Sequence, residues 1–455
     1  MDYPIWDVAI GGGVLMGLVA ISHVIVSHFA IGGGLLIAVT ETLAVKRGDG
    51  EMRNLAKRAS LVLILFSTVF GAISGVAIWV VAGLISPAAI SALIRNYVWG
   101  WAIEWVFFFI EIVAALVYYA TWDKISKRVH VMIGWIYFIA AYLSLVVING
   151  IVTFMLTPGE WLTTGAFWDG FFNPTYWPSL VLRTGITLLM ATAFMAFAAN
   201  RATPEARPRL ARYMGWWLLA GVVISYAGYR WWEVALPDSI RALFIGASPA
   251  LASLAATRHL LLWSLTAALV LGLLCLLALP RTAKVIPLLL IAIASFSFFG
   301  GYERLREGVR KPFLIHDFMF SNGVRVDEIQ RLNENGFLSK ARWAAHRSSG
   351  TEHATGRAVF RAQCSSCHTI DGYQAIMPLL PDDPDMTFGV LYMMYEQGEY
   401  YADLEPGQTV DKRDLNYPFM PPFVGTEEEI AALAEYLGEL ATAGPQVAMQ
   451  TGGAR

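Results

Sequence analysis

The chain has few charged residues and almost no cysteine. Only 15% of its 455 residues are Asp, Glu, Lys or Arg, and the formal net charge is -2. Because the chain has no basic tail or dense lysine cluster, nucleic acid is excluded as a partner. Of the three cysteines, Cys364 and Cys367 belong to one short motif and Cys275 stands alone in an apolar run. No disulfide framework is therefore predicted.

The first residues also lack the pattern of a cleavable leader. The N-terminus, MDYPIWDVAI, has no basic segment, and the apolar run after it is too long for a signal peptide. We therefore expect the first apolar helix to stay in the membrane.

Apolar residues dominate the composition. They make up 56% of the sequence, and the mean hydropathy of +0.52 is too high for a soluble protein. Apolar windows of spanning length recur at about 10–45, 58–86, 99–121, 129–156, 176–199, 211–231, 257–279 and 284–302. The sequence thus predicts an all-α, polytopic membrane bundle of about eight transmembrane helices in the lipid bilayer, with both termini on one side.

The loops between these spans alternate in charge. Those after odd-numbered spans are basic and contain Lys46, Arg47, Arg53, Lys57 and Arg58, then Lys124, Lys127 and Arg128, then Arg201, Arg207, Arg209 and Arg212, and finally Arg281 and Lys284. The alternate loops hold few positive charges. The second loop has only Arg95, the fourth has the acids Glu160 and Asp169 and no Lys or Arg, and the sixth has Arg241 together with the acids Glu233 and Asp238. Because basic loops stay in the cytoplasm, we expect both termini on the periplasmic side of the inner (cytoplasmic) membrane.

A C-x-x-C-H motif, Cys364 to His368, follows the last span. In such a motif the two thiols bind haem covalently and the histidine becomes an axial iron ligand. The alternative is a redox-active C-x-x-C beside an unrelated histidine. Because a helix-like segment at 356–363 precedes the motif and Met420 follows it, this part resembles a class I cytochrome c domain. The resemblance implies His368 and Met420 as axial ligands of haem c, a pair that suits electron transfer.

These observations divide the chain into three parts. Residues 1–302 form the predicted transmembrane domain, 303–352 a charged linker or surface-lying segment, and 353–455 a small α-helical cytochrome c domain. Since c-type haem is attached in the periplasm, the motif and the loop charges predict the same topology.

Ionisable side chains inside the spans are costly and are therefore functional candidates. They are His23 and His28 in the first span, Glu104 and Glu111 in the third, Arg183 in the fifth, Arg258 and His259 in the seventh, and Glu303 at the end of the eighth. His23 and His28 lie about 140° apart around a helix, so they cannot bind one iron. In the predicted topology His23, Glu104, Arg183, His259 and Glu303 fall in the outer part of their spans.

Several segments resemble subunit I of the cytochrome bd oxidase superfamily. They are His23 followed by IAVTET (37–42), then WAIEWVFFFIE (101–111), Trp122-Asp123-Lys124, Asn149-Gly150 and YERLR (302–306). The resemblance covers residues 1–200 and, in part, 280–312. It implies b-type haem in the bundle, with His23 and Glu303 as iron ligands, and a second membrane subunit.

The chain departs from that family in two respects. Where the family has a histidine ligand of its low-spin haem this chain has Leu182-Arg183, and near the expected methionine it has Arg258-His259. His259 is thus expected to ligate alone, to pair with another histidine or to ligate nothing. The long quinol-binding loop is also missing, because only about 25 residues join the sixth and seventh spans. The cytochrome c domain offers a different electron port.

The intramembrane histidines each have a structural alternative. His23 is predicted to ligate haem, and otherwise to bond to a neighbouring carbonyl. For His28 the alternatives are haem ligation and a polar contact between helices. His130, at the basic end of the fourth span, is predicted to be structural.

The charged candidates have alternatives too. Glu104 and Glu111 are predicted to relay protons or contact haem, and otherwise to be buried acids hydrogen-bonded within the bundle. Glu303 either ligates haem or pairs with a nearby arginine. Arg183 and Arg258 are predicted to bind haem propionates or buried carboxylates, or else to lie at the membrane interface.

The sequence therefore predicts a membrane-bound respiratory haem protein. Electrons would pass between a periplasmic redox protein or c-type cytochrome, haem c and b-type haem, and oxygen or a small oxidant would be reduced in the bundle. The alternative is a non-catalytic conduit or membrane-anchor subunit that links a periplasmic dehydrogenase to the quinone pool or another redox complex. His23, Glu303 and the pair of glutamates favour the first; the absent low-spin ligand and short loop favour the second.

Overall fold

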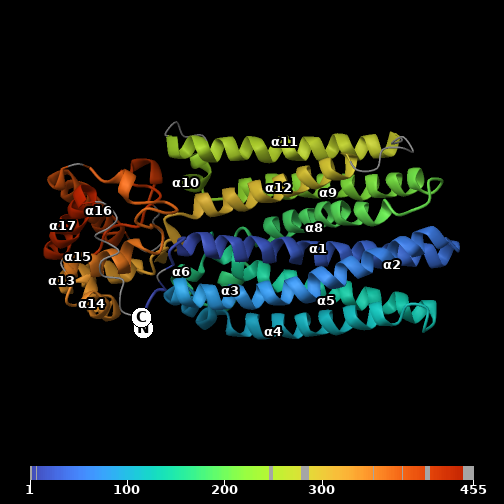
Figure 1. The fold of residues 1–455 in the computed structure, drawn as a ribbon, viewed down its shortest axis with the longest axis horizontal. Helices are drawn as coiled ribbons and strands as arrows, with labels where there is room; N and C mark the ends of the chain where they lie inside the picture. Colours follow the sequence, from blue (N-terminus) through green and yellow to red (C-terminus); the bar gives the residue numbers. More distant parts are fainter. Residues whose placement is uncertain are drawn as a thin grey trace.

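The computed structural model describes residues 3–6, 8–244, 249–277, 286–351, 353–381, 383–404 and 410–443. Long helices run side by side in one bundle, and a smaller helical domain lies at one end of it (Figure 1). The predicted all-α class is confirmed. The long helices are α1 (Gly12–Arg47), α2 (Gly50–Ile64), which continues through a π-helix (Leu65–Gly71) into α3 (Ala72–Ile85), α4 (Pro87–Ala120), α5 (Lys127–Phe154), α8 (Tyr176–Ala199), α9 (Arg207–Ala235), α11 (Pro249–Leu277) and α12 (Ile286–Arg310).

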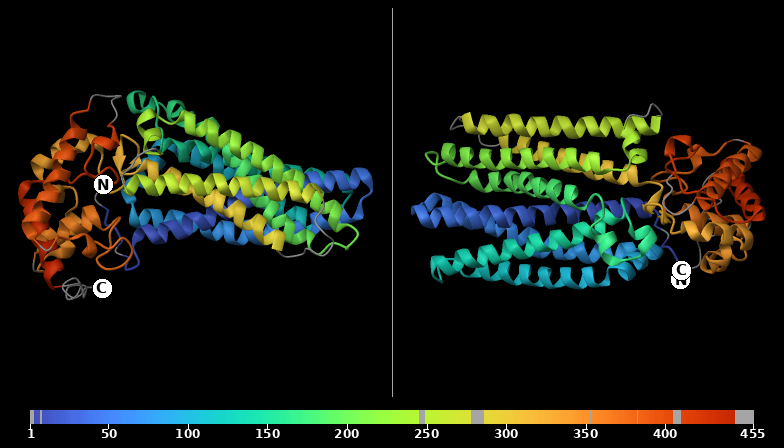
Figure 2. Two further views of the ribbon diagram at one scale, coloured as in Figure 1. Left: turned by 90° about the horizontal axis from the view of Figure 1, so that it is seen from above. Right: turned by 180° about the vertical axis from the view of Figure 1, so that it is seen from behind.

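Within the described residues, six helical segments are long and apolar enough to cross a membrane: Gly12–Arg47, Gly50–Ile85, Pro87–Ala120, Lys127–Phe154, Tyr176–Ala199 and Ala252–Leu277. They correspond to six of the eight predicted spans. The other two, α9 and α12, lie in the same bundle in all views (Figures 1 and 2). α9 begins with the polar sequence RPRLARY, and α12 ends with the polar sequence ERLREGVR.

Glycines let the central helices approach one another closely. Most of the apolar part of α8 is buried, and it packs against α1, α9 and α12. A Cβ added at Gly32 of α1 would lie 2.0 Å from the carbonyl oxygen of Thr187 in α8. One added at Gly185 of α8 would lie 2.5 Å from the backbone nitrogen of Ser225 in α9. Small residues at such crossings are typical of membrane helices that pack by close backbone contact.

Short elements cap the bundle at the end that faces the smaller domain. They are α6 (Trp161–Thr164), α7 (Phe167–Phe171), α10 (Asp238–Arg241) and a 3-10 turn (Ala242–Phe244). The N-terminal segment lies at the same end, where the backbone nitrogen of Trp6 donates to the carbonyl of Leu84 over 2.8 Å. The basic loops that follow α1, α4 and α8 lie at the far end (Figure 1). Arg281 and Lys284, the last pair of predicted basic loop residues, lie outside the described residues.

A β-hairpin joins the bundle to the smaller domain. Its strands are β1 (Phe313–Ile315) and β2 (Met319–Phe320). Ile315 and Met319 pack against residues of α5 and α6, whereas Phe313 and Phe320 enter the core of the smaller domain. The structure therefore differs from the predicted linker or surface segment at 303–352. The apolar side chains of the two strands are buried, some against the bundle and some in the smaller domain. The sequence did not indicate this burial because charged residues surround these few apolar ones.

The smaller domain is built from helices around two connected cores. They are α13 (Ile329–Asn335), α14 (Arg342–Ser348), α15 (Ala354–Val359), α16 (Pro384–Ala402) and α17 (Glu427–Ala443), with short 3-10 turns at Val326–Glu328, Phe337–Ser339, Met377–Leu379 and Lys412–Asp414. Gly356 of α15 crosses α17 so closely that a Cβ there would lie 2.0 Å from the carbonyl oxygen of Ala432. This crossing fixes α15, which leads directly into the C-x-x-C-H motif.

Candidate functional site

The C-x-x-C-H motif forms a compact turn at the end of α15. A π-helical turn, Phe360–Cys364, follows α15, and the backbone nitrogens of Cys367 and His368 both donate to the carbonyl of Cys364, over 3.0 and 2.9 Å. His368 Nδ1 donates to the carbonyl of Gln374 over 2.9 Å. This bond orients the ring and leaves the Nε2 lone pair for a metal, as is usual for metal-ligating histidines.

Two other residues of the predicted haem c site, Cys364 and Met420, contact one hydrophobic cluster of the smaller domain. This cluster includes Phe360, Leu391 and Leu437. Burial, with a smaller contribution from Cys367, raises the pKa of the Cys364 thiol to about 12. A redox-active C-x-x-C usually has a thiolate of lowered pKa, and the burial of Cys364 does not provide one.

The haem-attachment segment touches the start of the first helix. A Cβ on Gly11, the residue before α1, would lie 3.2 Å from the Thr369 methyl group, and one on Gly372 would lie 3.3 Å from the carbonyl oxygen of Ala9. Arg347 of α14 donates to the carbonyl of Ile5 over 3.2 Å and holds the N-terminal segment in place. The smaller domain therefore meets the bundle at the helix that carries His23 and His28.

His23 has the hydrogen bonding expected of a metal ligand. Its Nδ1 lies 3.2 Å from Ser74 Oγ, and Ser74 itself donates to the carbonyl of Phe70 over 2.5 Å. The serine oxygen must therefore accept from Nδ1, which leaves the Nε2 lone pair of His23 unused. The ring is half-buried and lies over Gly75, where an added Cβ would be 3.1 Å from it. His23 thus fits the side chain that the sequence assigns to b-type haem.

His28 is bonded differently. Its Nδ1 donates to the carbonyl of Val24 over 2.8 Å, so Nε2 is unprotonated and accepts from Arg183 Nη1 at 3.4 Å. The residue is 2% exposed. Its lone pair is therefore used by an arginine, which matches the polar interhelical contact that the sequence left open.

Arg183 and Glu303 form the centre of a buried charged cluster. Arg183 Nη2 lies 3.2 Å from Glu303 Oε1, without hydrogen-bond geometry, and Arg306 Nε donates to Glu303 Oε2 over 3.0 Å. Glu303 therefore makes the arginine pair that was the alternative to haem ligation. Within the described part of the chain, Arg183 Nε, Arg306 Nη1 and Arg310 Nε are buried and lack a hydrogen-bond partner. Unused guanidinium donors of this kind fit carboxylates such as haem propionates.

The structure does not bring Arg258 and His259 into this cluster. Arg258 Nε donates to Glu233 Oε1 of α9 over 2.8 Å, and Arg230 also pairs with Glu233. Because the next residue along a helix points about 100° away, His259 faces outward and is exposed. Arg258 thus binds a buried carboxylate, one of the two predicted roles.

Glu104 and Glu111 are half-buried on one side of α4. Ser144 donates to Glu104 over 2.9 Å, and Tyr137 donates to Glu111 over 3.3 Å. Both donors lie on α5, so each carboxyl has a hydroxyl partner on the neighbouring helix. This arrangement is compatible with either predicted role, proton relay or buried structural acid.

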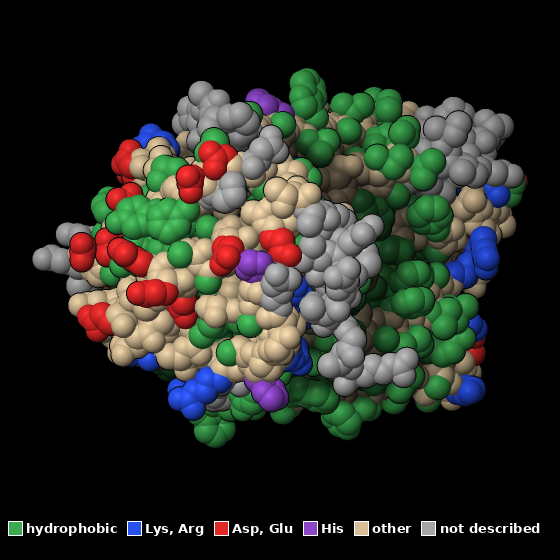
Figure 3. All heavy atoms as spheres, turned by 60° about the vertical axis from the view of Figure 1, so that its left-hand side comes forward, with side chains coloured by type: hydrophobic (Ala, Val, Ile, Leu, Met, Phe, Trp, Pro, Cys, Tyr) green, Lys and Arg blue, Asp and Glu red, His purple; other side chains and the backbone are tan. Residues whose placement is uncertain are grey.

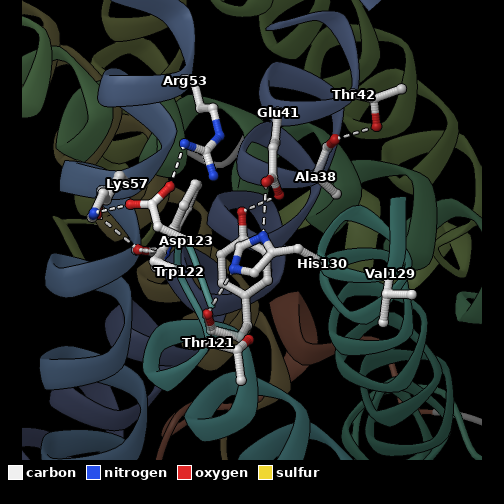
Figure 4. Close-up of polar contacts among 12 residues, drawn as sticks. Ala38, Glu41, Thr42, Arg53, Lys57, Thr121, Trp122, Asp123, Val129 and His130 are labelled. Atoms are coloured by element: carbon white, nitrogen blue, oxygen red, sulfur yellow. Dashed lines mark hydrogen bonds and ion pairs between the residues drawn. The ribbon is translucent and has the colours of Figure 1, made fainter. Parts of the chain in front are cut away.

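A second buried network lies at the basic end of the bundle (Figure 4). His130 Nδ1 lies 2.7 Å from Glu41 Oε1, and its Nε2 donates to the carbonyl of Tyr118 over 2.9 Å. The Tyr118 hydroxyl donates to Glu41 Oε2 over 2.8 Å. Glu41 and His130 are 0% and 1% exposed. His130 was predicted to be structural, and no role was predicted for Glu41. Glu41 could have been recognised as a carboxylate inside an apolar span.

Charged side chains close this network toward the loop. Arg53 and Lys57 of α2 donate to Asp123 over 2.6 and 2.7 Å (Figure 4). These hydrogen bonds, that from Lys57 foremost, lower the pKa of Asp123 to about 2. The guanidinium of Arg53 also lies over the Trp122 ring at 5.0 Å. The loop after α4 is thereby fixed to α2.

Comparison with known proteins connects both parts of the chain to families. Residues 14–234 match the family model of cytochrome bd terminal oxidase subunit I, and residues 353–441 match that of cytochrome c. The chain joins a cytochrome bd subunit I domain to a cytochrome c domain. It is therefore a membrane haem protein of respiratory electron transfer, with haem c in one domain and b-type haem in the other.

A solved structure has the same fold as the bundle. The bd oxidase from Geobacillus thermodenitrificans is 15% identical, with a TM-score of 0.57 over 69% of this chain and 89% of that chain. At this identity the likeness concerns the fold alone. No curated protein matches.

Proposed function

We propose that this cytochrome bd and cytochrome c fusion is a terminal reductase of oxygen or another small oxidant. Electrons enter at the cytochrome c domain from a periplasmic redox protein or c-type cytochrome and continue to the helix bundle. The observation that carries the proposal is the contact of Gly11 with Thr369, because it joins the haem-attachment segment to α1. From Gly12, where α1 begins, His23 lies about 17 Å along the helix axis.

The residues that would hold the cofactors are those that the motif, the family resemblance and the hydrogen bonds of His23 and His368 favour. Cys364, Cys367, His368 and Met420 would hold haem c, and His23 would ligate b-type haem, with Arg183 and Arg306 available to its propionates. The bound irons supply the one-electron chemistry. Glu104 and Glu111 would take up and release protons through their hydroxyl partners on α5.

The proposed orientation places the cytochrome c domain and both termini in the periplasm. Support comes from the loops at the opposite end of the bundle, which hold the basic residues that stay cytoplasmic. By its relation to the bd subunit I family, the chain is also proposed to assemble with a second membrane subunit.

A second candidate is a non-catalytic conduit or anchor that links a periplasmic dehydrogenase to the quinone pool or another redox complex. The observation that favours it is the pairing of Glu303 with both Arg183 and Arg306, because a carboxylate neutralised in this way is a poorer iron ligand. The two candidates differ in whether any ferrous haem of the bundle binds carbon monoxide.

Reduced spectra of the purified full-length protein, recorded with and without carbon monoxide, test the proposal. The oxidase predicts separate c-type and b-type signals and a carbon monoxide difference in the latter. His23→Ala should remove one b-type signal and leave the c-type signal unchanged, while His346→Ala, at an exposed position, should change neither. A b-type signal without any carbon monoxide difference would favour the conduit, and no b-type signal at all would contradict both.

A further inference from the structure

The cytochrome c domain has a charge that the rest of the chain does not share. Residues 353–455 contain 15 Asp and Glu against 5 Lys and Arg, a net charge of -10 within a chain of net charge -2. Figure 3 shows acidic and hydrophobic side chains side by side on the near face of this domain, with basic side chains at its margins and at the other end of the molecule. The exposed acids in the described residues of this domain are Asp371, Asp383, Asp385, Glu396, Glu399, Asp403, Asp414, Glu427, Glu428 and Glu435.

Three aromatic side chains form a stripe along α16. Phe388, Tyr392 and Tyr395 recur at the four- and three-residue spacing that places them on one face. The rings of Phe388 and Tyr392 are stacked at 6.2 Å, and those of Tyr392 and Tyr395 at 5.9 Å. Phe388 and Tyr392 are each 36% exposed. Large exposed aromatic groups in a row are uncommon on a surface that has no partner.

The inner end of this aromatic stripe reaches the haem c site. Tyr395 is half-buried and packs against the same hydrophobic cluster as Cys364 and Met420. The stripe therefore joins an exposed surface to the hydrophobic core that also contacts Cys364 and Met420.

Acidic side chains border the aromatic stripe. Glu396 lies one turn after Tyr392, and Glu399 one turn after Tyr395. Burial raises the pKa of Tyr395, and hydrogen bonding to Glu399 and the negative charge of Glu427 raise it further, which shows that both carboxylates lie near the ring. In the described residues, Glu396, Glu399 and Glu427 form no ion pair with a lysine or arginine.

The contacts between the bundle and the domain involve residues other than those of the aromatic stripe. The bundle contacts the domain through Thr369 and Tyr373 at Gly11. The last turn of α16 packs on the β-hairpin, where Tyr401 contacts Phe313 and Phe320, and the three residues of the stripe precede that turn.

We propose that the aromatic stripe, with Glu396, Glu399 and Glu427, is the docking surface for a soluble, cationic electron-carrier protein. An apolar, aromatic centre with a charged rim is the composition of transient protein interfaces. Complementary charge directs such a partner and raises its association rate. In the docked complex the reduced carrier loses one electron and the cytochrome c domain gains it, with no proton transferred. The inference rests on the proposed direction of electron flow and adds the site and charge of the donor.

Stopped-flow reduction of haem c in the full-length protein tests this surface. The probe is a strongly basic soluble cytochrome c in its reduced form, and the matched probe is the same protein succinylated to reverse its charge. The variant Glu396→Lys/Glu399→Lys/Glu427→Lys should reduce the association rate about tenfold or more at low ionic strength, a difference that salt should diminish. A control with equal charge change, Glu160→Lys/Glu205→Lys/Asp238→Lys, uses exposed acids of the bundle and should keep the wild-type rate.

Further variants and the comparison of the two probes test the docking surface. Tyr392→Ala should weaken binding of the basic probe without changing the haem c spectrum, which shows that the domain remains folded. Equal rates for the triple variant and the control, or equal rates for the two probes, would overturn the docking surface. A change in oligomeric state in Tyr392→Ala would assign the aromatic stripe to a second copy of the chain and overturn the proposal as well. If electrons reach haem c through this surface but go no further, the docking surface stands and the proposed terminal reductase fails.

Discussion

Hydrogen bonds to the ring nitrogens distinguish three of the intramembrane histidines, His23, His28 and His130. His23 donates from Nδ1 to Ser74 and keeps a free Nε2, whereas the Nε2 of His28 accepts from Arg183. His130 uses both nitrogens, one toward Glu41 and one toward a carbonyl. Because a metal needs an unshared lone pair, only the first of these environments suits ligation. Whether the second nitrogen of a histidine ring has a hydrogen-bond partner therefore indicates its suitability as an iron ligand better than the burial of the side chain does.

The pair of Glu41 and His130 should be a strong contributor to stability. Removing one member of a buried hydrogen-bonded pair leaves the other unpaired, which costs about 3–5 kcal/mol. We expect His130→Ala and Glu41→Ala each to lower the free energy of unfolding by an amount in this range, and the double variant to lose less than the sum. Denaturation in detergent, followed by tryptophan fluorescence, measures both.

Asp123→Asn supplies the control for that cycle, because Asn also tolerates the left-handed backbone of this residue (φ 61°). Its carboxylate is exposed and its partners are surface cations, so its removal should change the free energy of unfolding little. Strictly additive losses at Glu41 and His130 would contradict the buried pair.

Sequence reasoning found the residue types of the site but not their partners. The buried ionisable residues were visible because a membrane span has so few, and His368 belongs to a motif of fixed spacing. Met420 was implied by the resemblance to class I cytochrome c domains. The pairing of Glu41 with His130, and of His28 with Arg183, depends on which helices are neighbours. Spacing along one helix carries no such information, so neither pair could be predicted.

At the scale of helices, close packing rather than hydropathy defines the core. The six apolar spans among the described residues do not include α9 and α12, yet both lie in the bundle beside α8 and α11. Periodicity predicted where long helices lie because the bilayer requires about 20 apolar residues. It could not predict the β-hairpin at 313–320, whose apolar residues are few and are buried between two domains.

The crossing of α1 and α8 should be sensitive to a single methyl group. A Cβ at Gly32 would overlap the backbone of Thr187, so Gly32→Ala should force the helices apart and lower the free energy of unfolding by about 1–3 kcal/mol. Gly17→Ala, on the same helix, has open space within 4 Å and should be neutral or slightly stabilising. Thermal unfolding of both variants in one detergent makes the comparison, and equal midpoints would refute the close contact.

At the scale of the molecule, the cytochrome c domain is held on the bundle by polar contacts to the end of α12. Lys412 Nζ donates to the carbonyls of Val309 and Lys311 over 2.7 and 2.6 Å, and the residue is 3% exposed. Glu303 and Arg306 lie within the last turns of the same helix. The contact that fixes the domain thus lies beside the charged cluster of the bundle, and both are held by one rigid element.

This buried lysine should make the stability of the domain depend on pH. Burial lowers the pKa of Lys412 to about 7, with Arg310 adding to the shift and Asp317 opposing it. Between about pH 7 and the ordinary value near 10.5 the unfolded chain binds one more proton, so the free energy of unfolding rises with pH by up to about 1.4 kcal/mol per pH unit, and it levels off below about pH 7. The thermal midpoint followed by haem c absorbance should therefore increase from pH 7 to 9. Lys412→Met should abolish the slope and Lys46→Met, at the opposite end, should retain it; a slope unchanged in Lys412→Met would mean that the buried amine does not titrate in this window.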